Sequence, residues 1–178
     1  MFRTATLLTL AAVLASTSAC SKSDAPTKPA AKAAVAPLPG SYFLAEAPAD
    51  AKDIRAAKRS LKAGDKVVLI GRIGGSEDPF VPERAIFTLV DKAMKTCDEG
   101  SDMDTCKTPW DYCCDPREQI TANSAVVQIV GPDGQPLKAV LNGVKGLKPQ
   151  ATVTVVGTVS KAEGQNVVVN ATGLFVKP

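Results

Sequence analysis

The hydrophobic pattern of this chain changes from a helical to an extended period about a third of the way along. Residues 48–67 carry apolar side chains at helical spacing, with Asp50 at an N-cap position and Gly64 as a C-terminal stop. We predict one short N-terminal helix here. Its thin apolar stripe consists of Ile54, Ala57 and Leu61.

The chain after this helix consists of short runs rich in β-branched residues, separated by Pro, Asp and Gly. Such runs at close spacing predict an all-β fold, a small antiparallel barrel or sandwich. In the first run, Val67 and Leu69 alternate with Val68 and Ile70, so we expect the two pairs on opposite faces of the sheet. The predicted strands cover residues 66–75, 85–91, 125–131, 136–143, 151–159 and 165–176.

The motifs "GDKVVLIGRI", "FTLVD", "LNGVKGLKPQATVTVVGTV" and "VVVNATGLFV" occur in this order. Over residues 64–176 they resemble an OB-fold, in particular the tRNA-anticodon-binding type. The resemblance implies a small antiparallel OB-like β-barrel and nucleic-acid binding, with Arg72 as a candidate ligand-binding residue. Gly71 and Gly157 lie mid-strand, where we expect a bend or bulge. The residues in register with the pattern are Val68, Gly71, Arg72, Ile73, Phe87, Leu89, Asp91, Val153, Val155, Gly157 and Val159.

Residues 1–19 have the pattern of an export signal. Arg3 precedes the apolar run "TATLLTLAAVLAST", which is too short to span a bilayer. The run ends in "STSAC", which resembles the lipobox of bacterial lipoproteins and implies cleavage and acylation at Cys20. The alternative is ordinary secretion with cleavage after Ala19. Because Ser21 is not acidic, we expect a lipid-anchored protein of the bacterial cell envelope, at the outer membrane and facing the periplasm.

Residues 20–40, "CSKSDAPTKPAAKAAVAPLPG", are dominated by Ala, Pro and Lys. This composition buries too little apolar surface to offset the entropy of ordering, so we expect a tether without a fixed structure. Residues 41–178 then form one OB-like domain of ordinary size. Residues 92–122 are an insertion between its second and third barrel strands, and they hold a Cys-rich loop.

Composition excludes several classes of function. The chain has no histidine, which excludes Ser-His-Asp and Cys-His catalysis and metal sites with imidazole ligands. Its formal net charge is only +3, without the marked basic excess of a dedicated nucleic-acid binder. We therefore expect a non-catalytic protein without a cofactor.

The segment "CDEGSDMDTCKTPWDYCC" holds four of the five cysteines and the only tryptophan. In an exported protein, an even set of cysteines in a short loop favours disulfides. A bond between Cys113 and Cys114 would close a strained vicinal ring. We therefore favour pairings of these two residues with Cys97 and Cys106.

A metal site and a redox centre are the alternatives for these four cysteines. Thiolates bind Zn²⁺ or Cu⁺, but the spacing C-x₈-C-x₆-C-C lacks the close cysteine pairs of structural zinc sites. A calcium site at Asp98, Asp102 and Asp104 does not fit the EF-hand template. Redox chemistry lacks a C-x-x-C motif and would depend on a strained vicinal bridge. No metal ligand is therefore assigned.

The stretch "TPWDY" supplies aromatic side chains to the same loop. Trp110 and Tyr112 are candidate ligand-binding residues, since such rings stack on bases or sugars. The alternative is a small satellite core that packs the loop onto the barrel. The loop is locally acidic, which opposes binding of phosphate backbones.

These observations lead to two hypotheses for function. The first is a non-catalytic binding module with a protein, glycan or nucleic-acid ligand. The second is metal binding or thiol redox chemistry at the four loop cysteines. In both cases the expected partners are the membrane, through a lipid anchor at Cys20, and an unknown protein or polymer.

Overall fold

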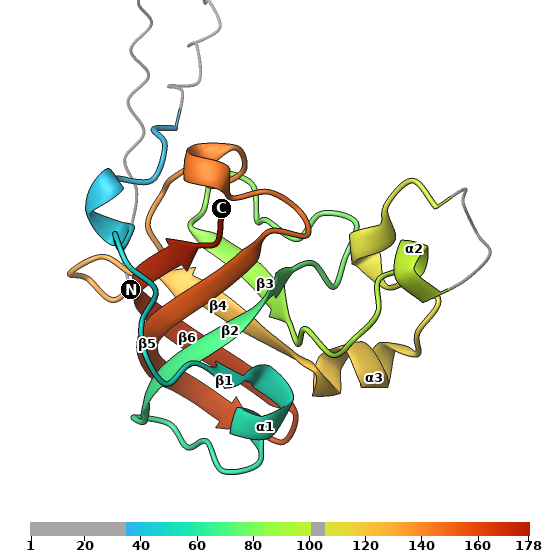
Figure 1. Cartoon of the computed structure of the whole chain (residues 1–178). Coiled ribbons are helices and arrows are strands. Elements are labelled where there is room, and N and C mark those ends of the chain that lie inside the picture. The colour runs from blue at the N-terminus through green and yellow to red at the C-terminus, as the bar shows by residue number, and fades with distance from the viewer. Residues whose placement is uncertain (1–34, 101–105) are drawn as a thin grey trace, which may run out of the picture. The chain divides into compact units, whose positions relative to one another are not determined.

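The computed structural model describes residues 35–100 and 106–178, which include a closed five-stranded barrel (Figure 1). The strands pair in the order β2–β3–β4–β6–β5, and β5 returns to β2. All neighbours in this ring are antiparallel except β4 and β6. The predicted all-β class is confirmed, and the closed barrel is compatible with an OB-like fold. The strands are β2 (Lys66–Ile73), β3 (Ile86–Val90), β4 (Ser124–Ile129), β5 (Thr152–Glu163) and β6 (Asn166–Val176).

Alternate side chains of the strands fill the barrel interior. On β2, Val67, Leu69 and Ile73 are buried, whereas Val68 and Ile70 are only partly covered, as the sequence pattern predicts. Burial of a large apolar side chain contributes roughly 1.5–3 kcal/mol, so this core is the main source of stability. Its largest fully buried members are Ile54, Leu69, Ile73, Phe87, Leu89, Ile129, Leu147 and Leu174.

Helix α1 (Ile54–Lys58) packs on the barrel core and is shorter than predicted. Its first residue, Ile54, is fully buried. The prediction of Asp50 as N-cap is wrong, because Asp50 has a φ of 59° and the chain after it is extended. These extended residues form β1 (Lys52–Asp53), which pairs with β2. The backbone is therefore still extended at Asp53, and this residue is the N-cap of the helix.

The predicted strand over residues 136–143 is wrong. This stretch makes only isolated bridges, one of which joins Val140 to Pro37. Pro136 has no N–H to donate to a strand ladder. The Leu38 N–H donates to the Val140 carbonyl (3.0 Å), and Leu38 is 3% exposed, so the last residues of the predicted tether pack on the barrel. The 3₁₀ turns of the barrel domain outside the cysteine-rich insertion are η1 (Gly40–Tyr42) and η3 (Val144–Gly146).

The predicted signal peptide over residues 1–19, the lipidation site Cys20 and most of the tether lie outside the described residues. Within residues 35–100 and 106–178, no helix combines the length and the apolar character needed to cross a membrane. The structure thus places the barrel and its insertion, and the export signal stays a prediction.

Gly71 and Gly157 serve different purposes in their strands. At Gly157 the pairing of β5 with β6 shifts register, which is the predicted bulge. At Gly71 the register is regular, but a Cβ would lie 2.5 Å from the Val90 carbonyl oxygen and 2.9 Å from Cδ1 of Ile54. Glycine at this position therefore allows β3 and α1 to approach β2 closely.

Lys58, at the end of α1, joins the helix to three other parts of the chain. Its ammonium group donates to the carbonyl oxygens of Thr121 (2.7 Å), Ser124 (2.7 Å) and Gln165 (2.5 Å). Burial lowers the pKa of Lys58, whereas the three carbonyl oxygens favour its charged form. The three N–H donors of the ammonium group thus pair with three carbonyl oxygens, which lie before β4, at the start of β4 and in the β5–β6 turn.

Replacing Lys58 with methionine is expected to lower the free energy of unfolding by about 2 kcal/mol, because three carbonyl oxygens lose their common donor. Methionine preserves most of the apolar stem, so the loss of packing is small. Urea unfolding followed by circular dichroism measures the change. Lys62→Met is the matched control, since Lys62 is exposed just beyond the same helix. Equal losses in the two variants would contradict this role of Lys58.

Candidate functional site

We call the chain between β3 and β4, residues 91–123, the cysteine segment, and its described residues 91–100 and 106–123 lie to one side of the barrel (Figure 1). Its two ends meet: the Asp91 N–H donates to the Asn123 carbonyl (2.8 Å), and the flanking Val90 and Ser124 are paired. The segment therefore leaves and rejoins the barrel at one point. Its helical elements are α2 (Cys97–Gly100), the 3₁₀ turn η2 (Pro109–Asp111) and α3 (Arg117–Ala122).

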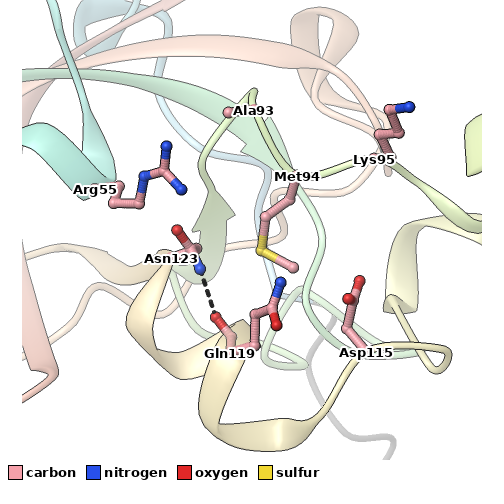
Figure 2. Close-up of a pocket in the computed structure, with 7 residues that line it drawn as sticks. All are labelled: Arg55, Ala93, Met94, Lys95, Asp115, Gln119 and Asn123. Atoms are coloured by element: carbon pink, nitrogen blue, oxygen red, sulfur yellow. Dashed lines mark hydrogen bonds between the residues drawn. The ribbon is translucent and has the colours of Figure 1, made fainter.

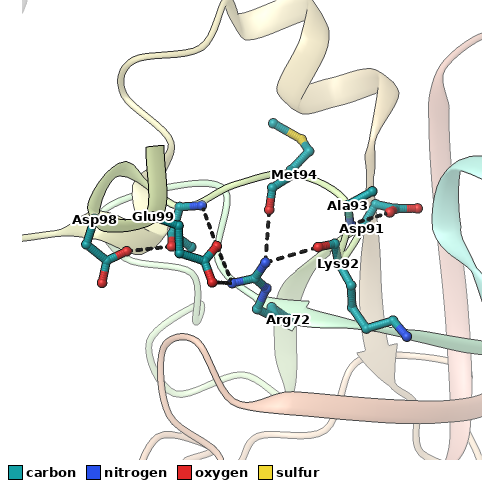
Figure 3. Close-up of polar contacts among 8 residues, drawn as sticks. Arg72, Asp91, Lys92, Ala93, Met94, Asp98 and Glu99 are labelled. Atoms are coloured by element: carbon teal, nitrogen blue, oxygen red, sulfur yellow. Dashed lines mark hydrogen bonds and ion pairs between the residues drawn. The ribbon is translucent and has the colours of Figure 1, made fainter. Parts of the chain in front are cut away.

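Arg72 of β2 fastens the start of the cysteine segment to the barrel (Figure 3). Its Nη1 donates to both carboxylate oxygens of Glu99, each at 2.9 Å. Its Nη2 donates to the carbonyl oxygens of Lys92 (3.0 Å) and Met94 (3.1 Å). The side chain of Arg72 is only 18% exposed. The guanidinium that we predicted to bind a ligand is thus engaged within the protein.

The later part of the segment docks on the loop after β2. The Trp110 carbonyl accepts a hydrogen bond from the Gly75 N–H (2.8 Å), and the Trp110 indole donates to the Glu77 carbonyl (3.0 Å). A Cβ on Gly74 would lie 2.5 Å from the Trp110 carbonyl oxygen, so glycine permits this approach. Gly74 and Gly75, at the end of the first predicted strand, therefore form the surface on which the turn η2 packs.

Tyr112 forms a second, smaller core with Val90, Met94 and Ile120. Its side chain is 1% exposed, and its φ of 57° turns the chain after η2. Burial raises the pKa of its phenol to about 12. The ring is covered, as the satellite-core interpretation expects, and it offers no free face to a ligand. Trp110, in contrast, stays partly exposed.

Three cysteine sulfurs and one carboxylate converge beside this second core. The sulfurs of Cys97 and Cys113 are 3.8 Å apart, whereas a disulfide bond is about 2.05 Å long. The predicted disulfides stay a prediction, because thiols in contact can be oxidised to a bridge. All four ligand atoms lie within 4.8 Å of one another, and we call this set the four-donor group. Its members are Cys97, Cys106, Asp111 and Cys113.

The donors are held by different parts of the segment. Cys97 begins α2 and is 5% exposed, whereas Cys113 follows η2 and is exposed. The Asp111 carboxylate accepts hydrogen bonds from the Cys113 N–H and the Thr108 hydroxyl, both at 2.8 Å. Burial acts to raise the pKa of Asp111, but these hydrogen bonds outweigh it and lower the pKa. Asp111 is thus an oriented, ionised carboxylate at neutral pH.

The thiols of the segment are electrostatically unequal. Burial acts to raise the pKa of Cys97, but hydrogen bonds from the Cys114 backbone and from the other cysteine side chains outweigh it and lower the pKa. The hydrogen bond with Asp111 raises the pKa of Cys113, and the hydrogen bond with Cys97 raises that of Cys114. The contacts among these thiols therefore favour the thiolate of Cys97 over those of Cys113 and Cys114.

The fold brings together residues whose spacing in the sequence does not suggest a metal site. Asp111, to which no role was assigned from the sequence, joins the cysteines because η2 and the positive φ of Tyr112 turn the chain back. The one signal for it is the pair Thr108-x-x-Asp111, which fixes a carboxylate within a turn. Arg72 supports the segment but is not a member of the four-donor group, and neither is Cys114.

Comparison with known proteins gives no assignment. No protein-family model, curated protein or solved structure matches this chain. Function is therefore inferred from the geometry of the site.

Replacing Arg72 with lysine is expected to loosen the cysteine segment while the barrel stays folded. Lysine keeps the charge but cannot bind a carboxylate and two carbonyl oxygens as a planar fork. A local loss of about 1–2 kcal/mol corresponds to roughly 5- to 30-fold faster hydrogen exchange over residues 91–99. Mass-spectrometric hydrogen exchange measures this rate. Arg117→Lys, at an exposed position of α3, is the control, and unchanged exchange in Arg72→Lys would refute the role of this contact.

Proposed function

We propose that this protein is a non-catalytic, lipid-anchored protein of the bacterial cell envelope whose OB-like barrel carries a site for one thiophilic metal ion. The observation that supports the site is the convergence of the four-donor group within 4.8 Å. Tetrahedral Zn²⁺ with Zn–S bonds of about 2.3 Å needs neighbouring sulfurs about 3.8 Å apart. The sulfurs of Cys97 and Cys113 have this separation, 3.8 Å.

One ion explains the arrangement better than two disulfides do. Two bridges need two separate pairs of sulfurs, whereas here Cys97 is hydrogen-bonded to the side chains of all three other cysteines of the segment, and three of the four sulfurs share one centre with an oriented carboxylate. The mixture of sulfur and oxygen donors favours Zn²⁺ over Cu⁺, which prefers soft ligands alone. Four protein ligands leave no open position for a substrate, so the ion has a structural role and ties α2 to the turn after η2.

The second candidate is the binding module predicted from the sequence, with the cysteines joined as disulfides. The partly exposed Trp110, held in place by Gly75 and Glu77, favours it as a contact for a protein or glycan. Nucleic-acid binding, which the tRNA-anticodon-binding type implies, has less support. Arg72 is engaged with Glu99, and the segment around Trp110 is acidic.

The metal site is tested on protein exported by the cell and purified without reductant. It is expected to contain one Zn²⁺ per chain, measured by inductively coupled plasma mass spectrometry, with unoxidised thiols by intact mass. Cys113→Ser and Asp111→Asn are each expected to weaken zinc binding about tenfold or more, because each removes or weakens a ligand.

Cys114→Ser is the matched control for Cys113→Ser, since its sulfur is outside the four-donor group and zinc is expected to stay bound. A chain that is lighter by two hydrogens for each bridge and holds no metal would overturn the metal site and establish the disulfides. Loss of zinc from Cys114→Ser alone would show that the donor set is wrongly assigned.

Lipid anchoring is tested separately by cell fractionation. The full chain is expected in the membrane fraction and Cys20→Ser in the soluble fraction, because each buried CH₂ of an acyl chain contributes about 0.8 kcal/mol. Cys97→Ser controls for the loss of a cysteine as such and is expected to stay with the membrane. If Cys20→Ser sediments like the unmodified chain, acylation at this residue is not the anchor.

A further inference from the structure

A cavity of about 310 Å³ lies between α1, the start of the cysteine segment and α3 (Figure 2). Met94, which is 7% exposed, lies between the polar side chains that surround the cavity. This volume is at the lower end of the range for small-molecule sites. None of the residues lining the cavity is a member of the four-donor group, so the cavity is separate from the metal site. The polar lining residues that matter here are Arg55, Lys95, Asp115, Gln119 and Asn123.

Asn123 supplies a fixed hydrogen-bond acceptor in this cavity. It is 8% exposed, and its amide nitrogen donates to the Gln119 carbonyl (2.8 Å), which sets the orientation of the amide. The amide oxygen then faces the Arg55 side of the cavity (Figure 2). Among residues 35–100 and 106–178, no fully buried side-chain oxygen lacks a partner, so this oxygen, which accepts no hydrogen bond there, is open to the cavity. An acceptor that is held in one orientation and is open to the cavity can accept a hydrogen bond from a ligand group that donates.

Arg55 and Asp115 supply opposite charges on the two sides of Met94 (Figure 2). The Arg55 backbone is fixed, because its N–H donates to the buried Asp91 carboxylate (2.7 Å). Neither the guanidinium of Arg55 nor the carboxylate of Asp115 makes a hydrogen bond or ion pair with the described part of the chain. A cation and an anion with an apolar side chain between them are thus available to a ligand.

We propose that this cavity binds a small zwitterion of the amino-acid type, with a carboxylate and an ammonium group on one carbon. The carboxylate pairs with Arg55, whose guanidinium binds carboxylates through two parallel N–H donors. The ammonium group donates to the Asn123 amide oxygen, the Asp115 carboxylate attracts it from the other side of Met94, and the apolar part of the ligand lies on Met94. Lys95 adds a positive charge at the rim, so acidic amino acids bind most tightly.

The proposal does not depend on the metal site and is tested on the purified protein by isothermal titration calorimetry. The probes are L-glutamate and glutarate, which has the same two carboxylates without the ammonium group. L-glutamate is expected to bind more tightly than glutarate. Arg55→Met is expected to weaken L-glutamate binding roughly 10- to 100-fold, because a charge-assisted hydrogen-bonded pair is lost.

Two variants separate the zwitterion site from simple charge attraction. Arg59→Met, an exposed arginine just beyond the same helix, is expected to bind L-glutamate like the unmodified protein. Asp115→Asn is expected to remove the preference for L-glutamate over glutarate. Circular dichroism confirms that each variant is folded.

Three outcomes would overturn the proposal. The first is an absence of L-glutamate binding up to about 10 mM, a concentration at which even a very weak small-molecule site is detected. The second is equal affinity for L-glutamate and glutarate in the unmodified protein, which would leave a carboxylate site only. The third is an unchanged affinity in Arg55→Met.

Discussion

Closure of the barrel around β2 is the constraint on which the rest of the structure depends. One edge of β2 is paired with β5 along most of its length, and the other edge is shared by β1 and β3. Because β3 reaches β2 only near the end of that strand, the remaining edge is available to β1. The chain that leaves β1 enters α1, and Ile54 then packs into the barrel core. A single strand thus determines where the helix lies.

The same strand determines where the cysteine segment can be attached. Arg72 is the last but one residue of β2, and Gly74 and Gly75 are the two residues directly after this strand. The arginine holds Glu99 and the chain before it, while the glycines receive the Trp110 carbonyl. The segment is therefore held at both sides of the four-donor group by one short stretch of sequence. Such double support fixes ligand positions far better than a free loop does.

Sequence patterns predict those features that depend on local chemistry. Alternating β-branched residues identify five barrel strands, and Gly157 marks the bulge in one of them. The errors have long-range causes: β1 exists because it pairs with β2, and residues 136–143 lack a regular partner. These pairings join parts of the chain that no local window contains.

The candidate site shows the same division between local and distant causes. Its cysteines and its aromatic residues are evident in the sequence, whereas Asp111 becomes a donor only through the fold of η2. The contacts of Arg72 depend on acceptors twenty or more positions away, so the sequence of its strand does not reveal that its guanidinium is engaged within the protein. Burial of Tyr112 likewise depends on Ile120 and Met94, which pack on it from other turns of the segment.

Because the two ends of the cysteine segment lie next to each other, the length and sequence of the segment between them can change without altering the barrel. Val90 and Ser124 are neighbours in the β3–β4 ladder whatever lies between them. The entropy of closing a loop grows only as the logarithm of its length, about 0.6 kcal/mol for each doubling. A barrel with this junction therefore tolerates loops of very different length at the same place. Whole elements can be exchanged there, by recombination or by design, while the strands keep their register.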